Sequence, residues 1–232
     1  MSFYKVKGAE NMKFLDKSID VVIFDMDGTI FDTERLAIKL YTEASQMLGI
    51  PLGLDILEKS IGLNAVATEK LMKETYGEDY PYGKVKEKAL QLKFAYINQF
   101  GLPIKEGVKE VLRKLRENSV PMALATSTDR DLTEKYLGAS GLNKYFPVIV
   151  CGNEVAKSKP EPEIFLKAVD LLGGEASRCI VLEDSENGLL AASRAGTIPV
   201  LVKDIKYPAD QVRKLAFCEY ESMIEIISCF EF

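Results

Sequence analysis

The sequence predicts an α/β protein with a three-layer, doubly wound parallel sheet and an inserted all-α helical domain. Short apolar runs alternate with amphipathic helical segments over residues 103–202, a pattern typical of a parallel sheet. Residues 34–100 carry only helical patterns, and they separate the first predicted strand from every later one. We therefore expect a core domain of residues 1–33 and 101–232 and a helical domain of residues 34–100.

The first predicted strand, residues 21–24, reads VVIF and ends abruptly in acid. Its branched and aromatic side chains suit a strand that is buried on both faces. Asp25 and Asp27 follow, two positions apart, and Gly28 and Thr29 then turn the chain away. Because ligands of open α/β sheets bind at the carboxyl ends of the strands, this stretch is the first candidate for a functional site.

The inserted segment repeats apolar residues at helical spacing. The expected helices cover residues 36–48, 54–61, 65–76 and 84–100. Gly49, Gly77 and Gly101 each follow one of these patterns, as glycine often does at helix ends. The absence of any strand pattern here indicates a second, small domain.

In the remaining core, apolar runs and helical segments alternate. Strands are expected at residues 121–125, 148–151, 179–182 and 199–202. One helix is expected to open at Pro160 and Pro162, because proline suits the first turn of a helix. Ser185 is expected to cap the next helix. The last segment, 221–230, is expected to be helical. No function is assigned to residues 1–20.

Composition and charge narrow the classes of function. The chain has 232 residues, and its hydrophobic fraction of 47% is ample for a sizeable core. A formal charge of -5 provides no net positive field to neutralise the phosphates of a nucleic acid. No apolar run approaches transmembrane length, so we expect no membrane partner. Small phosphorylated ligands remain possible partners, since they need only a local positive site. The expected assembly is a monomer or a weak homodimer.

The cysteines show no paired spacing of the metal-binding type. Two of them, Cys151 and Cys179, lie in or beside predicted strands, where a free cysteine behaves as a small apolar residue. We therefore expect a reduced, cytoplasmic setting.

The chain contains no histidine. This removes Ser-His-Asp hydrolysis, histidine general bases and histidine metal sites from consideration. Any acid–base or metal chemistry must use carboxylates, and carboxylate ligands favour hard cations such as Mg²⁺.

Polar residues of complementary kinds follow the predicted strands or precede a helix. They are Asp25, Asp27, Thr126, Ser127, Lys159, Glu183 and Asp184. Because the carboxyl ends of parallel strands lie along one edge, we expect these groups to converge although they are far apart in the sequence.

Such a set suits phosphoryl transfer through a covalent intermediate. The Asp25 carboxylate can attack phosphorus and form an aspartyl-phosphate, which splits one difficult displacement into two easier ones. Asp27 can protonate the leaving oxygen and later take a proton from water. Thr126 and Lys159 can bind the phosphate oxygens. Because phosphate and Asp25 repel each other, a cation is needed, and Mg²⁺ suits oxygen ligands.

The stretches that carry these residues are, in chain order, FDMDGTIFDTE, ALATST, SKPEPEIF and VLEDSENGLLAASRAG. Together they resemble the four motifs of the haloacid dehalogenase-like (HAD) hydrolase superfamily. The helical insertion resembles the cap of the subgroup that contains β-phosphoglucomutase and many small phosphatases. The resemblance implies a HAD-like Rossmannoid core with a helical cap that closes over the site.

The resemblance also implies a role for each residue. Asp25 would be the nucleophile and Asp27 the acid/base, and both would contact the metal, Asp27 through its carbonyl. Thr126, with Ser127 beside it, and Lys159 would bind phosphate. The implied magnesium ligands further include Asp184, with Glu183 assisting it. True dehalogenases in the superfamily lack the second aspartate, so Asp27 favours phosphate ester chemistry.

Each signal also has a structural explanation. Asp27-Gly28 alone is commonly a turn, whereas an EF-hand loop would need glycine where Ile30 stands. Thr126-Ser127 and Glu183-Asp184 could simply cap helices. The small residues from Gly188 onward are expected to serve close packing of a helix on the sheet.

Two further choices concern substrate contacts. Lys157 competes with Lys159 as the phosphate ligand, but only Lys159 precedes a proline at a helix start. In the insertion, Glu34, Arg35 and the loop 61–64 are candidates to face the substrate, and a solvated surface is an equal alternative.

The preferred function is a Mg²⁺-dependent phosphatase for a small organic phosphate: a sugar, nucleoside or short-acid phosphate. The alternative is a sugar phosphomutase of the β-phosphoglucomutase type, which normally presents a histidine in its cap; this chain has none. A third possibility is a non-catalytic phosphoacceptor or binding protein. Phosphoacceptor modules are much shorter and carry no acid/base aspartate two residues after the acceptor.

Overall fold

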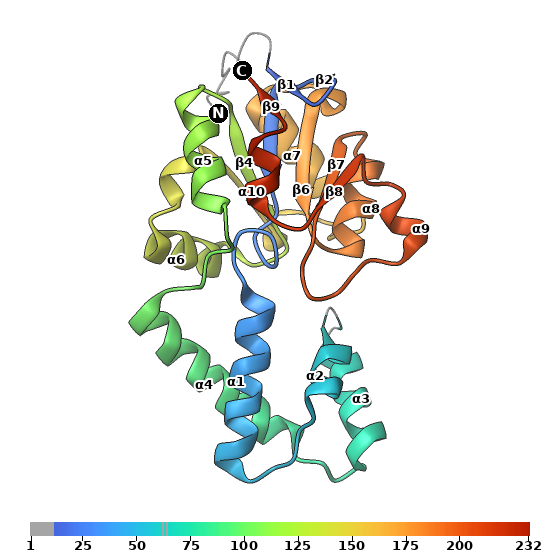
Figure 1. The fold of residues 1–232 in the computed structure, drawn as a ribbon. Helices are drawn as coiled ribbons and strands as arrows, with labels where there is room; N and C mark the ends of the chain where they lie inside the picture. Colours follow the sequence, from blue (N-terminus) through green and yellow to red (C-terminus); the bar gives the residue numbers. More distant parts are fainter. Residues whose placement is uncertain (1–11, 62, 64) are drawn as a thin grey trace. The chain divides into compact units, whose positions relative to one another are not determined.

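A computed structural model describes residues 12–61, 63 and 65–232. The chain divides into two compact units (Figure 1). The sheet unit consists of Met1–Phe31 and Ile104–Phe232, and the helical unit of Asp32–Pro103.

The sheet unit is built on a parallel six-stranded sheet in the described part of the chain. In spatial order its strands are β5 (Val148–Cys151), β4 (Met122–Thr126), β3 (Val21–Phe24), β6 (Cys179–Glu183), β7 (Ile198–Val202) and β8 (Cys218–Tyr220). The strand order reverses on either side of β3, which makes the sheet doubly wound. The expected α/β class is confirmed, but β8 was not predicted.

The register of the central strands determines which residues meet at their ends. All residues of β3 are buried, and Phe24 lies opposite Leu124 of β4 and Leu182 of β6. The next residue, Asp25, therefore emerges between Ala125 and Glu183.

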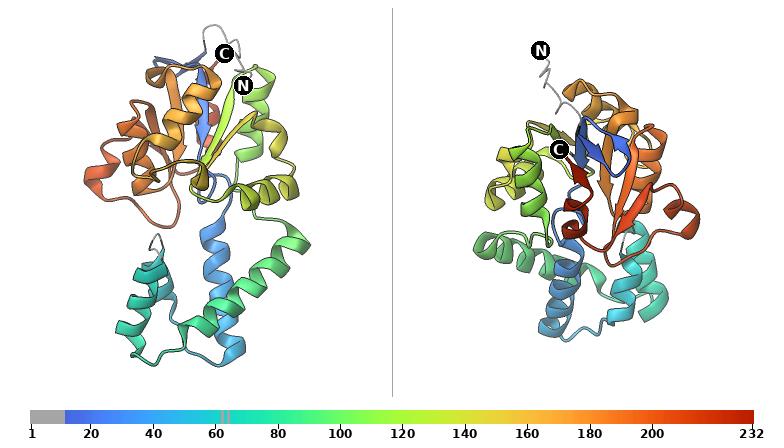
Figure 2. Two further views of the ribbon diagram at one scale, coloured as in Figure 1. Left: turned by 180° about the vertical axis from the view of Figure 1, so that it is seen from behind. Right: turned by 45° about the horizontal axis from the view of Figure 1, so that its top comes forward.

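Helices cover both faces of this sheet (Figures 1 and 2). The main helices are α5 (Val108–Glu117), α6 (Arg130–Ser140), α7 (Glu163–Leu172), α8 (Glu186–Arg194), α9 (Asp210–Arg213) and α10 (Met223–Ile227). Short 3₁₀ turns occur at η1 (Asn143–Tyr145), η2 (Gly152–Glu154) and η3 (Ala176–Arg178). Side chains of α7 and α8, such as Phe165 and Ala191, pack on one face, where they join Ile23 and Val181 in a buried core.

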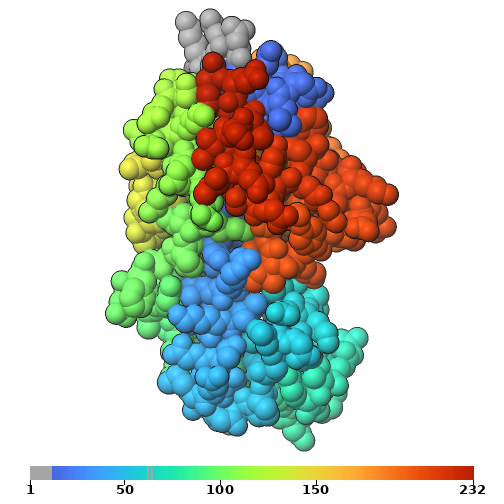
Figure 3. Space-filling view, in the orientation of Figure 1, coloured from blue at the N-terminus to red at the C-terminus, as the bar shows by residue number. Residues whose placement is uncertain are grey.

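A small antiparallel sheet was not predicted. It joins β1 (Lys13–Phe14) to β2 (Lys17–Ser18) and to β9 (Phe230–Glu231) (Figure 1). The segment expected to be helical over 221–230 forms α10 in its middle and then pairs as β9. The reason is tertiary: Phe14 is fully buried and its ring packs 5.0 Å from that of Phe230. This C-terminal segment lies at the surface beside α5 (Figure 3).

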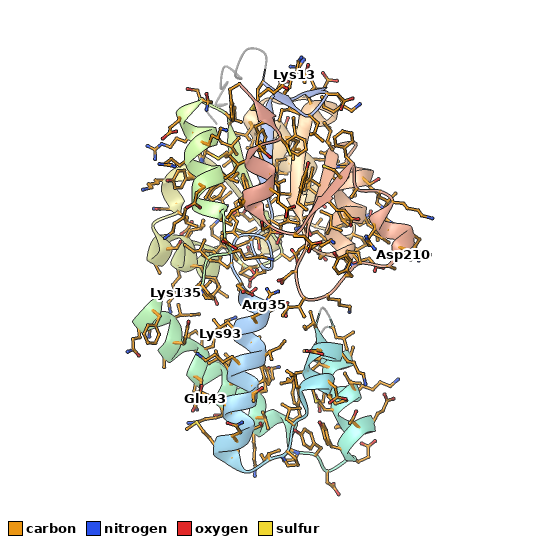
Figure 4. The ribbon with its side chains drawn as sticks, viewed as in Figure 1. Lys13, Arg35, Glu43, Lys93, Lys135 and Asp210 are labelled. Atoms are coloured by element: carbon orange, nitrogen blue, oxygen red, sulfur yellow. The ribbon has the colours of Figure 1, made fainter. Side chains whose placement is uncertain are left out.

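The helical unit contains α1 (Thr33–Leu48), α2 (Leu54–Ser60), α3 (Ala65–Tyr76) and α4 (Tyr82–Phe100). Helices α1 and α4 pack together through Ala44, Val85 and Ala89, while Glu43 of α1 is exposed (Figure 4). Met72 is fully buried with Ile56 of α2. Among the described residues, no helix combines the length and apolar character that a membrane crossing requires.

Candidate active site

The turn after β3 is tightly closed. Asp25 N–H continues the strand ladder by donating to Leu182 O at 3.0 Å. The N–H groups of Ile30 and Phe31 both donate to Met26 O, and Gly28 N–H donates to Phe31 O. Gly28 has a φ of +82°, a left-handed conformation that favours glycine. The backbone therefore holds the two acidic residues on one compact turn.

Asp25 forms an ion pair with Lys159, which also contacts Glu183. Lys159 Nζ lies 2.5 Å from Asp25 Oδ1 and 2.8 Å from Glu183 Oε1. All three side chains are nearly inaccessible, at 9% or less exposure. The structure thus joins three predicted site residues from separate parts of the chain, with one ammonium bridging two carboxylates.

The position of Lys159 is determined by further contacts. Its ammonium donates to Ala125 O at 3.2 Å and lies 4.8 Å from the centre of the Phe165 ring. Lys157, the competing candidate, is exposed, and its backbone N–H donates to Glu163 at the start of α7. Of the two lysines, Lys159 is the one at the strand ends.

Glu183 is fixed from the other side by the start of α8. Ser185 donates to Glu183 Oε2 through its N–H and its hydroxyl, and accepts from Gly188 N–H as the expected helix cap. A Cβ at Gly188 would lie 1.8 Å from the Glu183 carboxylate. Gly188 therefore makes room for the carboxylate itself, a more specific role than the predicted packing of helix on sheet.

Asp184 faces the turn after β3. Thr29 Oγ1 donates to Asp184 Oδ1 at 2.9 Å. A Cβ at Gly28 would lie 2.2 Å from Asp184 Oδ2, so the glycine also permits this close approach. The sequence places both acids of the pair Glu183-Asp184 at one strand end, and the structure gives them different partners.

Asp27 is held by the loop after β4. Thr128 Oγ1 donates to Asp27 Oδ2 at 2.7 Å, and Thr128 N–H donates to Thr126 Oγ1 at 3.1 Å. Thr126 is buried, whereas Ser127 is exposed beside it. A Cβ at Gly152 would lie 2.2 Å from Ser127 O, so η2 packs directly against this loop.

The charges of this site do not balance. Burial raises the pKa of Asp25 to about 8, because the effects of burial and of Glu183 exceed the opposing effect of Lys159. Burial, followed by the charges of Glu183 and Asp25, also raises the pKa of Asp184. Lys159 has a raised pKa because its two carboxylate partners outweigh burial. The one ammonium contacts Asp25 and Glu183 but not Asp184, and a further cation would relieve the repulsion among the three carboxyl groups.

The residues present suit magnesium. Among the residues that the structure describes, no three Cys, Asp or Glu side chains are grouped as ligands of one ion. Mg²⁺ does not require such a cage, because it is usually held by one or two carboxylates and keeps several waters. Asp25 and Asp184 supply oxygen ligands of that kind, with surplus negative charge between them.

Several contributing residues were not predicted. Thr29, Thr128 and Ser185 each donate a hydroxyl hydrogen bond to one of the predicted acids. Each lies within two residues of a predicted site residue, so their place in the motifs was the available signal. Lys105 contacts the turn at Gly28 O, and nothing in its local sequence indicated this.

The helical unit has a pocket of its own. It has a volume of about 190 Å³, and its lining includes Glu34, Tyr41, Ser60, Ile61, Thr68 and Tyr82. Arg35, labelled in Figure 4, donates to Asp32 Oδ1 at 3.1 Å. Of the loop 61–64 that was a substrate-facing candidate, residues 62 and 64 lie outside the described residues.

Comparison with known proteins identifies the class. The family model described as haloacid dehalogenase-like hydrolase matches residues 22–202. A probable pseudouridine-5'-phosphatase from Drosophila melanogaster is 36% identical over 192 residues, which cover 78% of this chain and 80% of the relative. A phosphorylated carbohydrates phosphatase from Thermotoga maritima is 31% identical over 178 residues, which cover 77% of this chain and 82% of the relative.

A solved structure agrees with these relatives. A HAD family hydrolase from Deinococcus radiodurans R1, with bound phosphate and sodium, superposes with a TM-score of 0.78 at 25% identity. The match covers 91% of this chain and 94% of that one. This chain belongs to the haloacid dehalogenase-like hydrolases, in the β-phosphoglucomutase-like subgroup. Within that family it is a phosphoric monoester hydrolase.

Proposed function

We propose that the protein is a Mg²⁺-dependent phosphatase that hydrolyses a small organic phosphate monoester through an aspartyl-phosphate on Asp25. The observation that carries this proposal is the contact of Lys159 with both Asp25 and Glu183 at the carboxyl end of the sheet. This arrangement gives a buried carboxylate a fixed direction and a positive charge beside it, as a nucleophile that attacks an anion needs.

In the first half-reaction an Asp25 carboxylate oxygen forms a bond to phosphorus, and the bond from phosphorus to the ester oxygen breaks. Asp27, protonated at this stage, gives its proton to the departing alkoxide. The hydrogen bond from Thr128 fixes the side chain of Asp27, which lies on the same turn as the nucleophile. Thr126, Ser127 and Lys159 bind the phosphate oxygens in this proposal.

In the second half-reaction Asp27 takes a proton from a water molecule whose oxygen attacks phosphorus. The bond between phosphorus and Asp25 breaks, and inorganic phosphate leaves. General acid–base help of this kind typically contributes about 10²- to 10⁴-fold in rate.

Magnesium would be held by Asp25, Asp184 and the carbonyl of Asp27, with Glu183 assisting. When bound, it supplies positive charge that screens the phosphate from Asp25. Thr29 orients Asp184 for this task through its hydrogen bond.

We further propose that the helical unit, predicted as residues 34–100, acts as a cap that selects the substrate and limits access of water. The relatives named above act on phosphorylated nucleoside or carbohydrate compounds by their names, which supports a small phosphorylated metabolite as substrate. A cytoplasmic setting and a monomer or weak homodimer complete the proposal.

The test is a phosphate-release screen over sugar, nucleoside and short-acid phosphates, with and without Mg²⁺, and with Asp25→Asn as the blank. We expect release that stops when EDTA removes the metal and resumes when Mg²⁺ is added. Equal release by the blank, or undiminished release in EDTA, would count against the mechanism.

Two further measurements, of the sugar phosphate product and of phosphate bound to the protein, separate the alternatives. A phosphomutase would form glucose 6-phosphate from β-glucose 1-phosphate faster than it releases phosphate. A phosphoacceptor would accumulate a long-lived acyl-phosphate on Asp25 without turnover. The absence of histidine from the chain speaks against the mutase.

A further inference from the structure

Lys105 is a largely buried lysine of the sheet unit that the proposed reaction does not use. It stands two residues after Pro103, the last residue of the helical unit. Its side chain is only 11% exposed. Burying an ammonium is costly unless its protons find acceptors, so its contacts indicate its role.

The ammonium of Lys105 has three acceptors. Nζ donates to Gly28 O at 2.6 Å, to Lys203 O at 3.0 Å and to Asp204 Oδ1 at 3.0 Å. The backbone N–H of Lys105 donates to Ile30 O at 2.9 Å. One residue therefore holds the turn after β3 at two carbonyls and ties it to the loop between β7 and α9.

The contact with Gly28 leads to the candidate metal ligand. The carbonyl of Gly28 and the N–H of Thr29 share one planar peptide unit, so fixing the carbonyl fixes where Thr29 begins. Thr29 in turn donates to Asp184 Oδ1. There is little freedom for adjustment, because Gly28 approaches Asp184 closely. Lys105 thus acts on Asp184 through two intervening residues.

Asp204 is the counter-ion of Lys105. Its side chain is 3% exposed, and its Oδ1 lies 3.0 Å from the Lys105 ammonium. The lysine therefore neutralises a buried negative charge in the loop that it ties to the turn after β3.

We infer that Lys105, paired with Asp204, is a positioning residue of the active site, which holds Gly28 so that Thr29 and Asp184 keep the arrangement that binds magnesium. This inference rests on the proposed function for its metal. Its experiment does not depend on turnover, so the two can fail separately.

The direction in which Mg²⁺ affinity changes when Lys105 is replaced distinguishes a positioning role from a purely electrostatic one. Removing a lysine takes positive charge away from a cation site, and Coulomb's law alone would then tighten Mg²⁺ binding. Loss of positioning has the opposite effect, since supporting residues around a metal site typically contribute about 10- to 100-fold in affinity or activity.

The experiment is calorimetric titration of the full chain with Mg²⁺ alone. Wild type is compared with Lys105→Met, Lys105→Arg and a control, Lys167→Met. Lys167 also donates from a half-buried position to a backbone carbonyl, that of Glu154, away from the turn. We expect Lys105→Met to raise the Kd for Mg²⁺ about tenfold or more, and Lys167→Met to leave it unchanged.

Lys105→Arg covers the case in which Lys105→Met does not fold. It keeps the charge opposite Asp204, but a planar guanidinium cannot direct one nitrogen to three acceptors. We expect it to weaken Mg²⁺ binding as well, by a smaller factor. Wild-type or tighter binding by a folded Lys105→Met, or wild-type binding by Lys105→Arg if that is the only folded variant, would overturn the inference. Phosphate release by wild type, measured in parallel, tests the proposed function independently.

Discussion

The interiors of the two units contain different kinds of side chain. Among the described residues, the sheet unit buries charged side chains, including Asp25, Glu183 and Asp204. In the described part of the helical unit, the buried polar residues are the uncharged Thr33 and Ser45. Its interior depends instead on apolar contacts and on stacked tyrosines: Tyr41 with Tyr82 and Tyr76 with Tyr80.

The two kinds of interior differ in how they tolerate substitution. Buried charges destabilise a fold unless they are paired, and breaking such a pair is more harmful than replacing it as a whole. Apolar and aromatic packing tolerates substitutions that preserve volume. A sheet unit restricted by its charges and a helical unit free to vary would suit an enzyme that keeps one reaction and changes its substrate. The following experiments test that division.

The largest effect is expected at the nucleophile. Asp25→Asn should lower turnover about 10⁴-fold or more, because the amide cannot form the covalent intermediate. Without metal, its melting temperature should not fall, because Glu183 remains as the counter-ion of Lys159, the amide oxygen can still accept from that lysine, and the change removes a carboxylate whose pKa burial raises to about 8. Steady-state kinetics and thermal melts check both parts. A marked loss of stability would show that Asp25 is needed for the fold.

The helical unit should respond in the opposite way. Met72→Ala opens a cavity beside Ile56 and Tyr82 and should cost about 2–5 kcal/mol of stability in that unit. Hydrogen exchange should then speed up in α2 and α3 while β3 and β4 stay protected. Val66→Ala is the control, because Val66 is 80% exposed. Equal loss of protection in both units would mean that they unfold together.

Two glycine-to-alanine changes in the sheet unit sharpen the contrast. Gly188→Ala should displace the Glu183 carboxylate from Lys159 and lower kcat/KM about 10- to 100-fold. Gly138→Ala in α6 meets nothing within 4 Å and should stabilise the protein by up to about 1 kcal/mol. Kinetics and melts of both variants are the measurement. Wild-type activity in Gly188→Ala would remove Glu183 from the proposed site.

The smallest effect concerns an ion pair outside the chemistry. Burial opposes ionisation of Glu154, but hydrogen bonds from Cys151 N–H and Arg130 outweigh it and lower the pKa of Glu154. A carboxylate with a lowered pKa stabilises the fold above its unfolded pKa, and that stabilisation is lost as the pH falls through the folded value.

Glu154→Gln should therefore cost about 1 kcal/mol near pH 7, and the difference from wild type should shrink as the pH falls below about 4. Melting temperatures from pH 7 to pH 3 check this. A difference that stays constant over this range would assign the loss to packing.

Much of the sheet unit could be predicted because its signals are local. Val21 to Asp27 contain a buried strand and its acidic end within seven positions, and the four later parallel strands were expected close to where they occur. Strand β8 and the small sheet were missed because strands of two or three residues carry too short a pattern. Their pairing depends on residues as distant as Phe14 and Phe230.

The sequence by itself determined the fold class, the inserted helical segment, and the acids, hydroxyls and lysine that occupy the strand ends. These follow from periodicity and from the order of residues along a few turns of chain. Only the tertiary structure decided which of these residues contact one another. The pairs are Lys159 with Asp25, 134 positions apart in the sequence, Thr29 with Asp184, 155 apart, and Lys105 with Asp204, 99 apart. The physical reason is that such contacts depend on strand register and on the packing of loops at one sheet edge, which no local stretch of sequence contains.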